Sequence, residues 1–417
     1  MKKRGWKIGR LEMDKTISFI QPSRNNLKYL KWSYESIRKN LGYRHEICMA
    51  DDFSDDGTWK WMKRIAEKDS NVKIYRNSGP ERLGHTILYD TLVDMATNDI
   101  VMIYHADMYS LPGFDKEILR HIKPGVVVSG TRIEPPLHPP GPEKVLIDFG
   151  IEPEEFKEQE LLNWFSNDYK PEQETTEGIF APWAIYKEDF QKIGGHDPLF
   201  APQSKEDSDI FNRFILAGYK VVQTRKGCVY HMTCRGSRFA DGAKRNPDGQ
   251  VFMKNRETDE WLAQNERSTR NFIRKWGTMV EHDPYLKPII TPHYSIGFEL
   301  TEAADVETIR QLEPYCQYMV VPAREEILQY IEKEQPNTDY QLDKKLHTDI
   351  PNNPIYDIKV VFNPWELTAQ SYQILINLHK IIKDSGEEGA RFQLDIFDIW
   401  IEQMVEHQED NIVCDSN

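Results

Sequence analysis

Short apolar runs alternate with amphipathic segments along the first part of the chain. Apolar runs predict buried strands, and apolar positions at helical spacing between them predict helices. The expected strands cover 17–20, 47–50, 72–75 and 99–104, and the expected helices cover 27–41, 59–67 and 88–95. Strands that alternate with helices are typical of βαβ units. The fold class is therefore α/β, with a mostly parallel sheet flanked by helices.

Three polar clusters follow the ends of these strands. They are Pro22 to Asn25, Asp51 to Thr58 and His105 to Asp107. Ligands of open parallel sheets bind at the carboxyl ends of the strands. The clusters therefore predict a pocket of the kind that holds a nucleotide.

The alternation stops near Glu134, where a proline-rich loop begins. We expect residues 133–177 to form an excursion over the active site, because regular structure resumes at Gly178. The segment 235–256 is basic and contains glycine, and we expect it to be a mobile loop.

A second region follows near Tyr285. Its expected strands cover 295–300, 317–321, 358–362 and 392–396, and its expected helices cover 306–312 and 372–382. This pattern predicts a small α/β domain. We expect a larger domain over 1–283, which carries the polar clusters, and a smaller accessory domain over 284–417.

Composition narrows the possible partners. A chain of 417 residues has room for two or three domains, and its net charge of −14 argues against a nucleic acid or an anionic membrane as partner. A local basic patch can still hold a phosphate. The five cysteines form no CxxC pair, which fits a reducing compartment. The sequence shows no signal-peptide pattern and no apolar stretch of about 20 residues, so we expect a cytoplasmic protein without a membrane span.

The acidic segment from Asp51 to Thr58 directly follows a predicted strand. Carboxylates at a strand end can accept hydrogen bonds from a base N–H or a ribose hydroxyl. Gly57 permits a tight turn into the next helix, and Thr58 suits the beginning of that helix. The alternative interpretation is a solvated acidic turn.

His105 and Asp107 follow the fourth predicted strand. Two side chains at positions i and i+2 of a strand end point the same way, so they can share a divalent metal or a sugar diphosphate. Oxygen ligands suit Mg²⁺ or Mn²⁺, and an imidazole fits Mn²⁺ better. The alternative is a His–Asp hydrogen bond without a ligand.

Glu206 and Asp207 open a predicted helix. A carboxylate placed near an acceptor hydroxyl can act as a general base. Acidic residues are also common in a first helical turn because they suit the helix dipole, and this alternative remains open.

In their order and spacing, these segments resemble the family 2 glycosyltransferases of the GT-A fold. The motifs are Pro22-Ser23-Arg24-Asn25, Asp51 to Thr58 as D-D-x-S-x-D-G-T, Leu83-Gly84-His85, His105-Ala106-Asp107 at the D-x-D element, Gly194 to Phe200, Glu206 to Asp209, and Arg213 with Gly218-Tyr219. The agreement extends over about residues 16–235. One departure is His105, which stands where the family has the first aspartate of D-x-D.

The resemblance implies that a sugar moves from a nucleotide-diphosphate sugar to a hydroxyl group, with inversion at the anomeric carbon. A UDP-sugar is the favoured donor, and the acceptor is a glycan, a lipid-linked molecule or a protein. The implied cofactor is a divalent metal, Mn²⁺ or Mg²⁺.

The resemblance also implies roles for individual residues. Donor binding falls to Pro22, Ser23, Arg24, Asn25, Asp51, Asp52, Gly84 and His105. Asp107 holds the metal, with His231 and His105 as further ligands. Asp207 is the general base, and Glu206 is the competing candidate. Independently of the resemblance, we expect the basic loop with Arg235 and Arg238 to fold over the diphosphate and exclude water.

Two other functions are compatible with parts of the pattern. A sugar nucleotidyltransferase has a similar sheet, and Ser129 to Arg132 superficially looks like its glycine-rich loop. That loop belongs after the first strand rather than in mid-chain. A non-catalytic nucleotide-sugar or carbohydrate-binding relative would explain His105 as a sign of lost activity. The retained Asp107, Glu206 and Asp207 count against it.

Overall fold

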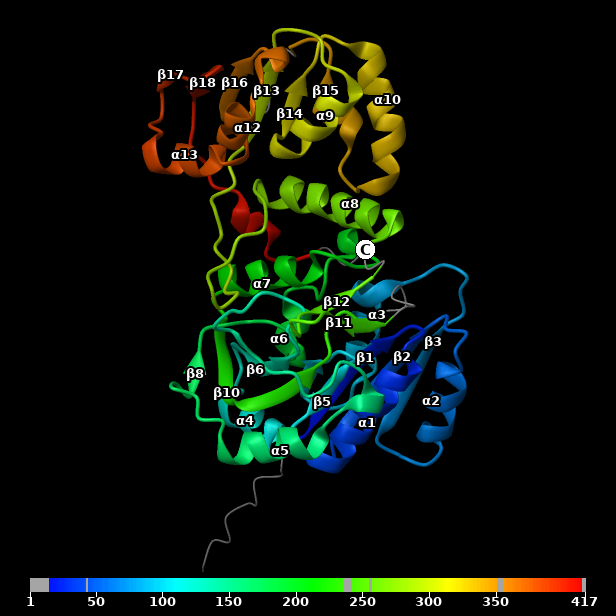
Figure 1. The fold of residues 1–417 in the computed structure, drawn as a ribbon. Helices are drawn as coiled ribbons and strands as arrows, with labels where there is room; N and C mark the ends of the chain where they lie inside the picture. Colours follow the sequence, from blue (N-terminus) through cyan, green and yellow to red (C-terminus); the bar gives the residue numbers. More distant parts are fainter. Residues whose placement is uncertain (1–14, 43, 236–241, 255–256, 351–355, 415–417) are drawn as a thin grey trace, which may run out of the picture.

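The computed structural model describes residues 15–42, 44–235, 242–254, 257–350 and 356–414. Within these residues the chain forms two separate large sheets, stacked along the long axis of the molecule (Figure 1). The larger sheet has ten strands in the order β3-β2-β1-β4-β9-β6-β10-β5, with β7 beside β6 and β8 beside β10.

The strands of the larger sheet are β1 (Ile17–Ser23), β2 (Glu46–Asp52), β3 (Val72–Asn77), β4 (Ile100–Ile103), β5 (Met108–Ser110), β6 (Val126–Glu134), β7 (Lys144–Leu146), β8 (Thr175–Thr176), β9 (Trp183–Tyr186) and β10 (Lys220–His231). Its helices are α1 (Leu27–Asn40), α2 (Thr58–Ala66), α3 (Gly84–Met95), α4 (Phe114–His121), α5 (Glu158–Asn167), α6 (Lys187–Lys192) and α7 (Glu206–Leu216).

The centre of this sheet is parallel. Strand β1 pairs in parallel with β2 and β4, and β2 pairs in parallel with β3. Strands β1 and β2 are buried along their whole length, because helices cover both faces of the sheet. The predicted fold class, a mostly parallel α/β sheet flanked by helices, is confirmed.

The excursion over 133–177 contains more regular structure than we expected. It includes β7, α5 and β8, so regular structure is already present before Gly178. The apolar side chains of α5 explain the difference, since Leu161 is buried in a cluster with Phe149 and Tyr230. Likewise, the described part of 235–256 holds a hairpin of β11 (Ala243–Arg245) and β12 (Val251–Met253).

The smaller sheet has six strands in the order β15-β14-β13-β16-β18-β17. They are β13 (Ile296–Leu300), β14 (Tyr318–Val320), β15 (Leu346–His347), β16 (Ile358–Phe362), β17 (Arg391–Leu394) and β18 (Phe397–Ile401). The accompanying helices are α9 (Val306–Leu312), α10 (Arg324–Glu334), α11 (Leu342–Lys345), α12 (Ala369–Ile376) and α13 (Leu378–Ser385).

Two boundaries in this second region differ from the prediction. The strand expected over 392–396 ends at Leu394, because the chain turns at Asp395 with φ of 54° and returns as β18. The helix expected over 372–382 is two helices that meet at Asn377.

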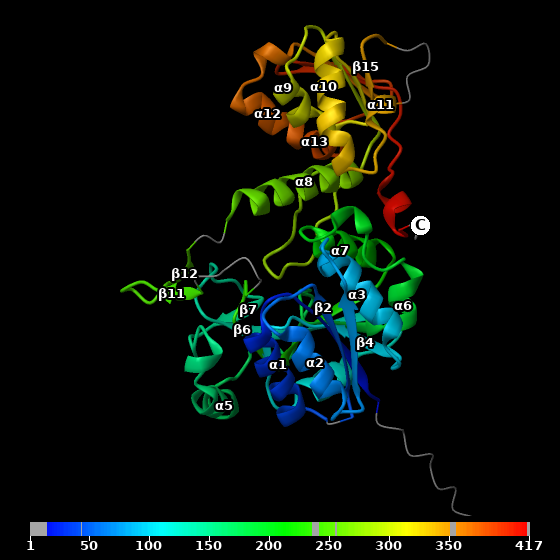
Figure 2. The ribbon, with the colours of Figure 1, turned by 90° about the vertical axis from the view of Figure 1, so that its right-hand side faces the viewer.

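Helix α8 (Asp259–Trp276) lies between the two sheets (Figure 2). Its Ile273 belongs to the core of the second region. Its Arg274 is fully buried, with Nη2 2.6 Å from Glu313 Oε2 and 2.8 Å from Glu334 Oε1. Among the described residues, none of the helices combines the length and apolar character needed to cross a bilayer.

Candidate active site

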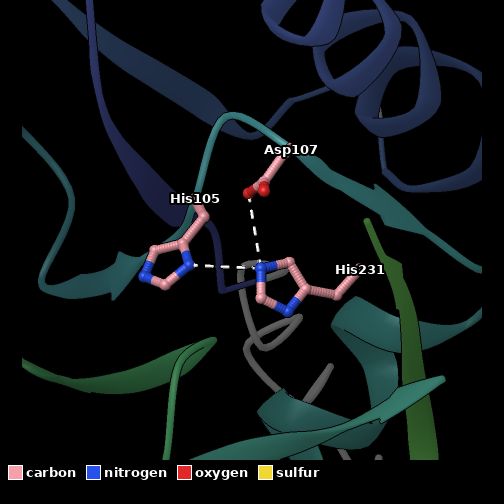
Figure 3. Close-up of side chains that lie close together, drawn as sticks. All are labelled: His105, Asp107 and His231. Atoms are coloured by element: carbon pink, nitrogen blue, oxygen red, sulfur yellow. Dashed lines mark hydrogen bonds and ion pairs between the residues drawn. The ribbon is translucent and has the colours of Figure 1, made fainter. Parts of the chain in front are cut away.

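Three possible metal ligands meet at the carboxyl end of β4. His105 and Asp107 lie in the short connection between β4 and β5, and His231 is the last residue of β10. Strand β10 pairs with β5 so that His231 stands opposite Met108. This register brings His231 beside Asp107, although the two residues are far apart in the sequence (Figure 3).

The three side chains converge on one small volume. His231 Nε2 lies 3.4 Å from Asp107 Oδ1 and 3.5 Å from His105 Nδ1. One ligand atom from each residue lies within 4.8 Å of the others. Two imidazoles and a carboxylate form a ligand set that fits Mn²⁺ better than Mg²⁺.

Glu134 fixes the orientation of the His231 ring. Its Oε1 lies 2.9 Å from His231 Nδ1, which leaves Nε2 directed at Asp107 and His105. Glu134 is itself buried and lies 3.3 Å from Arg132 Nη1. A carboxylate behind a histidine in this way orients the ring and raises its basicity as a metal ligand.

Charges within the cluster separate the pKa values of its members. Burial raises the pKa of Asp107, but the charge of His231 and its hydrogen bond to Asp107 outweigh burial and hold that pKa below its ordinary value. Burial lowers the pKa of His231, yet Asp107 and Glu134 raise it to about 9. Burial and the His231 charge lower the pKa of His105 to about 3. His105 is therefore neutral at neutral pH and able to bind a metal, whereas His231 carries a proton that a bound metal would displace from Nε2.

The cluster opens into a cavity of about 370 Å³. The cavity is lined by Pro22, Asn26, His85, Tyr89, His105, Ala106, Asp107, Arg132, Glu134, His138, Phe180, His231, Thr233, Cys234 and Arg235. A second hollow, of about 680 Å³, lies over α1 and shares Asn26 and Arg235 with the first.

Asp52 holds the loop that leads into α3. Its Oδ1 accepts hydrogen bonds from Leu83 N at 3.0 Å and from Asn77 Nδ2 at 2.7 Å. Its Oδ2 accepts a hydrogen bond from Gly84 N at 3.0 Å. Three bonds within the protein leave this carboxylate little capacity for a ligand.

Asp51 differs from its neighbour. Its side chain is fully buried, and Oδ1 accepts a hydrogen bond from Ser54 N at 3.1 Å. Its Oδ2 has no hydrogen-bond partner, although Arg76 Nε lies 3.5 Å away. Burial raises the pKa of Asp51. A buried acceptor without a partner favours Asp51 over Asp52 as the residue that binds a ligand group.

The cluster from Pro22 to Asn25 is joined to the acidic segment. Asn25 N donates to Ser54 Oγ at 2.9 Å, and Asn25 Oδ1 accepts from Asp55 N at 2.9 Å. Ser23 Oγ donates to Asn26 Oδ1. Arg24 Nη1 is buried without a hydrogen-bond partner.

Gly84 permits a close approach between two parts of the site. Its φ is +76°, and a Cβ at this position would lie 2.0 Å from the carbonyl oxygen of Pro202. Any side chain here would displace the loop that precedes α7. Gly84 therefore sets the spacing between the two loops.

Glu206 and Asp207 form the first turn of α7. Burial raises the pKa of Glu206, and the charge of Asp207 raises it further. Burial also raises the pKa of Asp207, while the charges of His196 and Arg132 counteract that rise. Burial raises the pKa of Tyr89, which lines the cavity, and the charges of Asp207, Glu206 and Asp107 raise it further. The acidic pair and the metal-ligand cluster therefore both lie near this phenol.

Arg235 contacts the cluster through its backbone. Its N–H donates to Asp107 Oδ2 at 3.2 Å, while Nη1 donates to Thr233 O at 2.9 Å. Nη2 donates to Ile151 O in the excursion. The guanidinium group thus holds the excursion in this structure. Arg238 lies outside the described residues.

Several cavity residues were not identified from the sequence, above all Glu134, Arg132 and Tyr89. Arg132 and Glu134 stand at positions i and i+2 at the end of β6, as His105 and Asp107 do in the β4–β5 connection. Charged residues two apart at a strand end were the available signal.

Comparisons with known proteins find a family model that matches part of the chain and solved structures to which the chain is similar. A family model described as glycosyl transferase family 2 matches residues 18–194. The chain is also similar to three solved structures, of which it spans between 44% and 66% of the length.

The first is GalNAc-T7 with UDP, GalNAc and Mn²⁺, at 17% identity and a TM-score of 0.41, covering 52% of this chain and 44% of that one. The second is TarS 1–349 of S. aureus in complex with UDP, at 14% identity and a TM-score of 0.37, covering 52% of this chain and 60% of that one. The third is the mannosyltransferase PcManGT from Pyrobaculum calidifontis with GDP-Man and Mn²⁺, at 17% identity and a TM-score of 0.40, covering 65% of this chain and 66% of that one.

Proposed function

We propose that this chain transfers a hexosyl group from a nucleotide-diphosphate sugar to a hydroxyl group, since a family model described as glycosyl transferase family 2 matches residues 18–194. A UDP-sugar is the favoured donor, the acceptor is a glycan, a lipid-linked molecule or a protein, and the anomeric carbon is inverted. Residues 1–283 form the catalytic domain, and residues 284–417 form an accessory domain. The observation that carries the proposal is the convergence of His105, Asp107 and His231 in one cavity.

The donor binds across the strand ends. The unpartnered Oδ2 of Asp51 accepts a hydrogen bond from the base or the ribose, and Asp52 and Gly84 keep the neighbouring loop in place. Asp107, His231 and His105 hold Mn²⁺ or Mg²⁺. When bound, the ion supplies positive charge next to the diphosphate leaving group.

The acceptor hydroxyl attacks from the side of α7. Asp207 takes the hydroxyl proton as the oxygen bonds to the anomeric carbon and the nucleoside diphosphate leaves. Burial raises the pKa of Asp207, and the charges of His196 and Arg132 counteract that rise, which favours the ionised form that a base requires.

The test uses purified full-length chain with a panel of UDP-, GDP- and dTDP-sugars and Mn²⁺. Thermal shift identifies the donor, because a ligand at 100 times its Kd adds about 2.7 kcal/mol of stability. We expect slow release of nucleoside diphosphate from that donor by wild type, and none by Asp107→Ala.

The products separate the proposal from its alternatives. Release of pyrophosphate would identify a nucleotidyltransferase instead. A donor that binds and is never cleaved, with any acceptor offered, would identify a non-catalytic binding protein.

A further inference from the structure

A third hollow, of about 380 Å³, lies beside α8, between the loop before α7 and the second sheet. Its lining contains four arginines and two glutamates: Arg82, Pro202, Glu260, Ala263, Gln264, Glu266, Arg267, Arg270, Arg310 and Asn337. This basic lining contrasts with the net charge of −14 of the whole chain.

Two of the four arginines are paired with carboxylates. Arg270 Nη2 lies 2.7 Å from Glu334 Oε2, and Arg310 Nη2 lies 2.7 Å from Glu307 Oε1. Glu266 adds a second, longer contact to Arg310, at 3.3 Å. These pairs form part of the wall and leave little positive charge uncompensated.

The other two arginines retain unused donors. The Nε atoms of Arg82 and Arg267 are both buried without a hydrogen-bond partner. Arg82 Nε lies 3.8 Å from Asp52 Oδ2, beyond hydrogen-bond distance, and Arg82 Nη2 makes a long bond of 3.4 Å to Gln203 Oε1. Arg267 Nη2 donates to the carbonyl oxygen of Ala201.

Burial lowers the pKa of Arg82, and the charge of Arg24 lowers it further. Burial also lowers the pKa of Arg267, against the charge of Glu334. Both shifts reflect positive charge that is removed from water without a full counter-charge. A bound anion would supply that charge through charge-assisted hydrogen bonds.

The hollow is joined to the proposed base through one loop. Pro202 forms part of its wall, and the chain continues from there through Ser204 into Glu206 and Asp207. Asp52, which accepts a hydrogen bond from Gly84 N at 3.0 Å, lies 3.8 Å from Arg82. A molecule in the hollow therefore contacts the loop that leads into the proposed base and an arginine that lies near Asp52.

We propose that this hollow binds an anionic group of the acceptor, a phosphate or a carboxylate, through Arg82 and Arg267. A hydroxyl group of the same molecule reaches Asp207. That the anion belongs to an acceptor rests on the proposed function, whereas the anion site itself does not.

The test is calorimetric titration of the full chain with glycerol phosphate and with glucuronate, and with methyl glucoside as the neutral probe. UDP and Mn²⁺ are present throughout, so that the anion does not enter the donor site. We expect wild type to bind at least one anion and not the neutral sugar. The anion that binds more tightly identifies the group as phosphate or carboxylate.

Variants locate the binding. Arg82→Gln and Arg267→Gln each remove a charged donor, so we expect about 10-fold weaker anion binding or more. Arg64→Gln removes one exposed charge on α2 and should bind as wild type does. If one hollow variant does not fold, the other still decides the question.

Donor hydrolysis is measured on the same samples. Wild type that cleaves donor and binds neither anion would overturn this inference and leave the proposed function intact. Anion binding that is equal in Arg267→Gln and Arg64→Gln would also overturn it. The remaining outcome is a chain that never cleaves a donor but binds an anion, with weaker binding in Arg267→Gln. That result would support the anion site and refute the proposed transferase function.

Discussion

Replacement of Glu134 by glutamine tests whether the cluster of His105, Asp107 and His231 is a metal site. Glu134 touches neither substrate nor metal in our proposal, and it acts through His231, whose Nδ1 lies 2.9 Å away. Glutamine keeps the shape and one hydrogen bond but removes the negative charge. The His231 ring then becomes a weaker and less firmly oriented ligand.

The expected size of the effect follows from this arrangement. Changes to a residue that orients a metal-binding histidine typically weaken metal affinity by about 10–100-fold. This factor corresponds to about 1.4–2.7 kcal/mol. Glu134 also lies 3.3 Å from Arg132 and 3.7 Å from Lys144, so its replacement disturbs a buried charge network as well.

Glu143 provides a matched control for that network. It is buried, and it lies 3.7 Å from Arg132 and 3.4 Å from Lys144. No contact between Glu143 and His231 is found among the described residues. Glu143→Gln therefore disturbs the same two cations and leaves the ring of His231 in place.

Mn²⁺ titration followed by the electron paramagnetic resonance signal of the free ion measures the affinity directly. We expect Glu134→Gln to weaken Mn²⁺ binding by the factor above, and Glu143→Gln to bind nearly as wild type does. Equal Mn²⁺ affinity in the two variants would refute the assignment of Glu134 as the residue that orients a metal ligand.

Three further predictions concern the cluster and α7. Asp107→Ala should abolish transfer, whereas His105→Ala should only reduce it. Initial rates at varied Mn²⁺ concentration measure both effects. A larger loss of rate in His105→Ala would refute Asp107 as the more important metal ligand. Asp207→Asn should lower turnover by about 10²–10⁴-fold with donor affinity nearly unchanged, and wild-type turnover would exclude it as the base. Burial and Asp207 raise the pKa of Glu206 above its ordinary 4.5, so the folded chain holds more protons than the unfolded chain just above that pH. Wild type should therefore lose stability relative to Glu206→Gln as pH rises from about 5 to 9, and a constant difference in melting temperature would contradict this.

The regular part of the fold could be predicted because its signal is local. Strands β1 and β2 are apolar runs, and they are buried as expected. The β17–β18 hairpin was not predicted because its turn residue, Asp395, lies in a run of strand-forming residues without a glycine. Helix α5 was not predicted either, because its acidic sequence is also typical of a loop. Leu161 is the one residue of this helix that is buried.

In the candidate site, too, some contacts follow from the local sequence and others do not. The nearness of His105 to Asp107 follows from their spacing at a strand end, so the sequence sufficed to pair them. The contact between Glu134 and His231 depends on how β6, β10 and β5 pair across the sheet, which no local pattern encodes. For Asp52, the motif position predicted a role in ligand binding. In the structure, its oxygens accept hydrogen bonds from the loop before α3.

Helix α8 connects the second region to the proposed base. On one side, Asn265 Oδ1 accepts from Ser204 Oγ at 2.7 Å, where Ser204 and Lys205 both have positive φ. Such backbone costs about 1–3 kcal/mol per residue and persists only when its surroundings hold it. On the other side, Arg274 is buried against Glu313 of the second region, and removal of one partner from a buried pair typically costs about 3–5 kcal/mol. The same helix thus holds the turn that presents Asp207 and is itself held by the second region. We therefore expect the second region to contribute to the geometry of the proposed base, even though the candidate ligand and base residues lie in the first 283 residues.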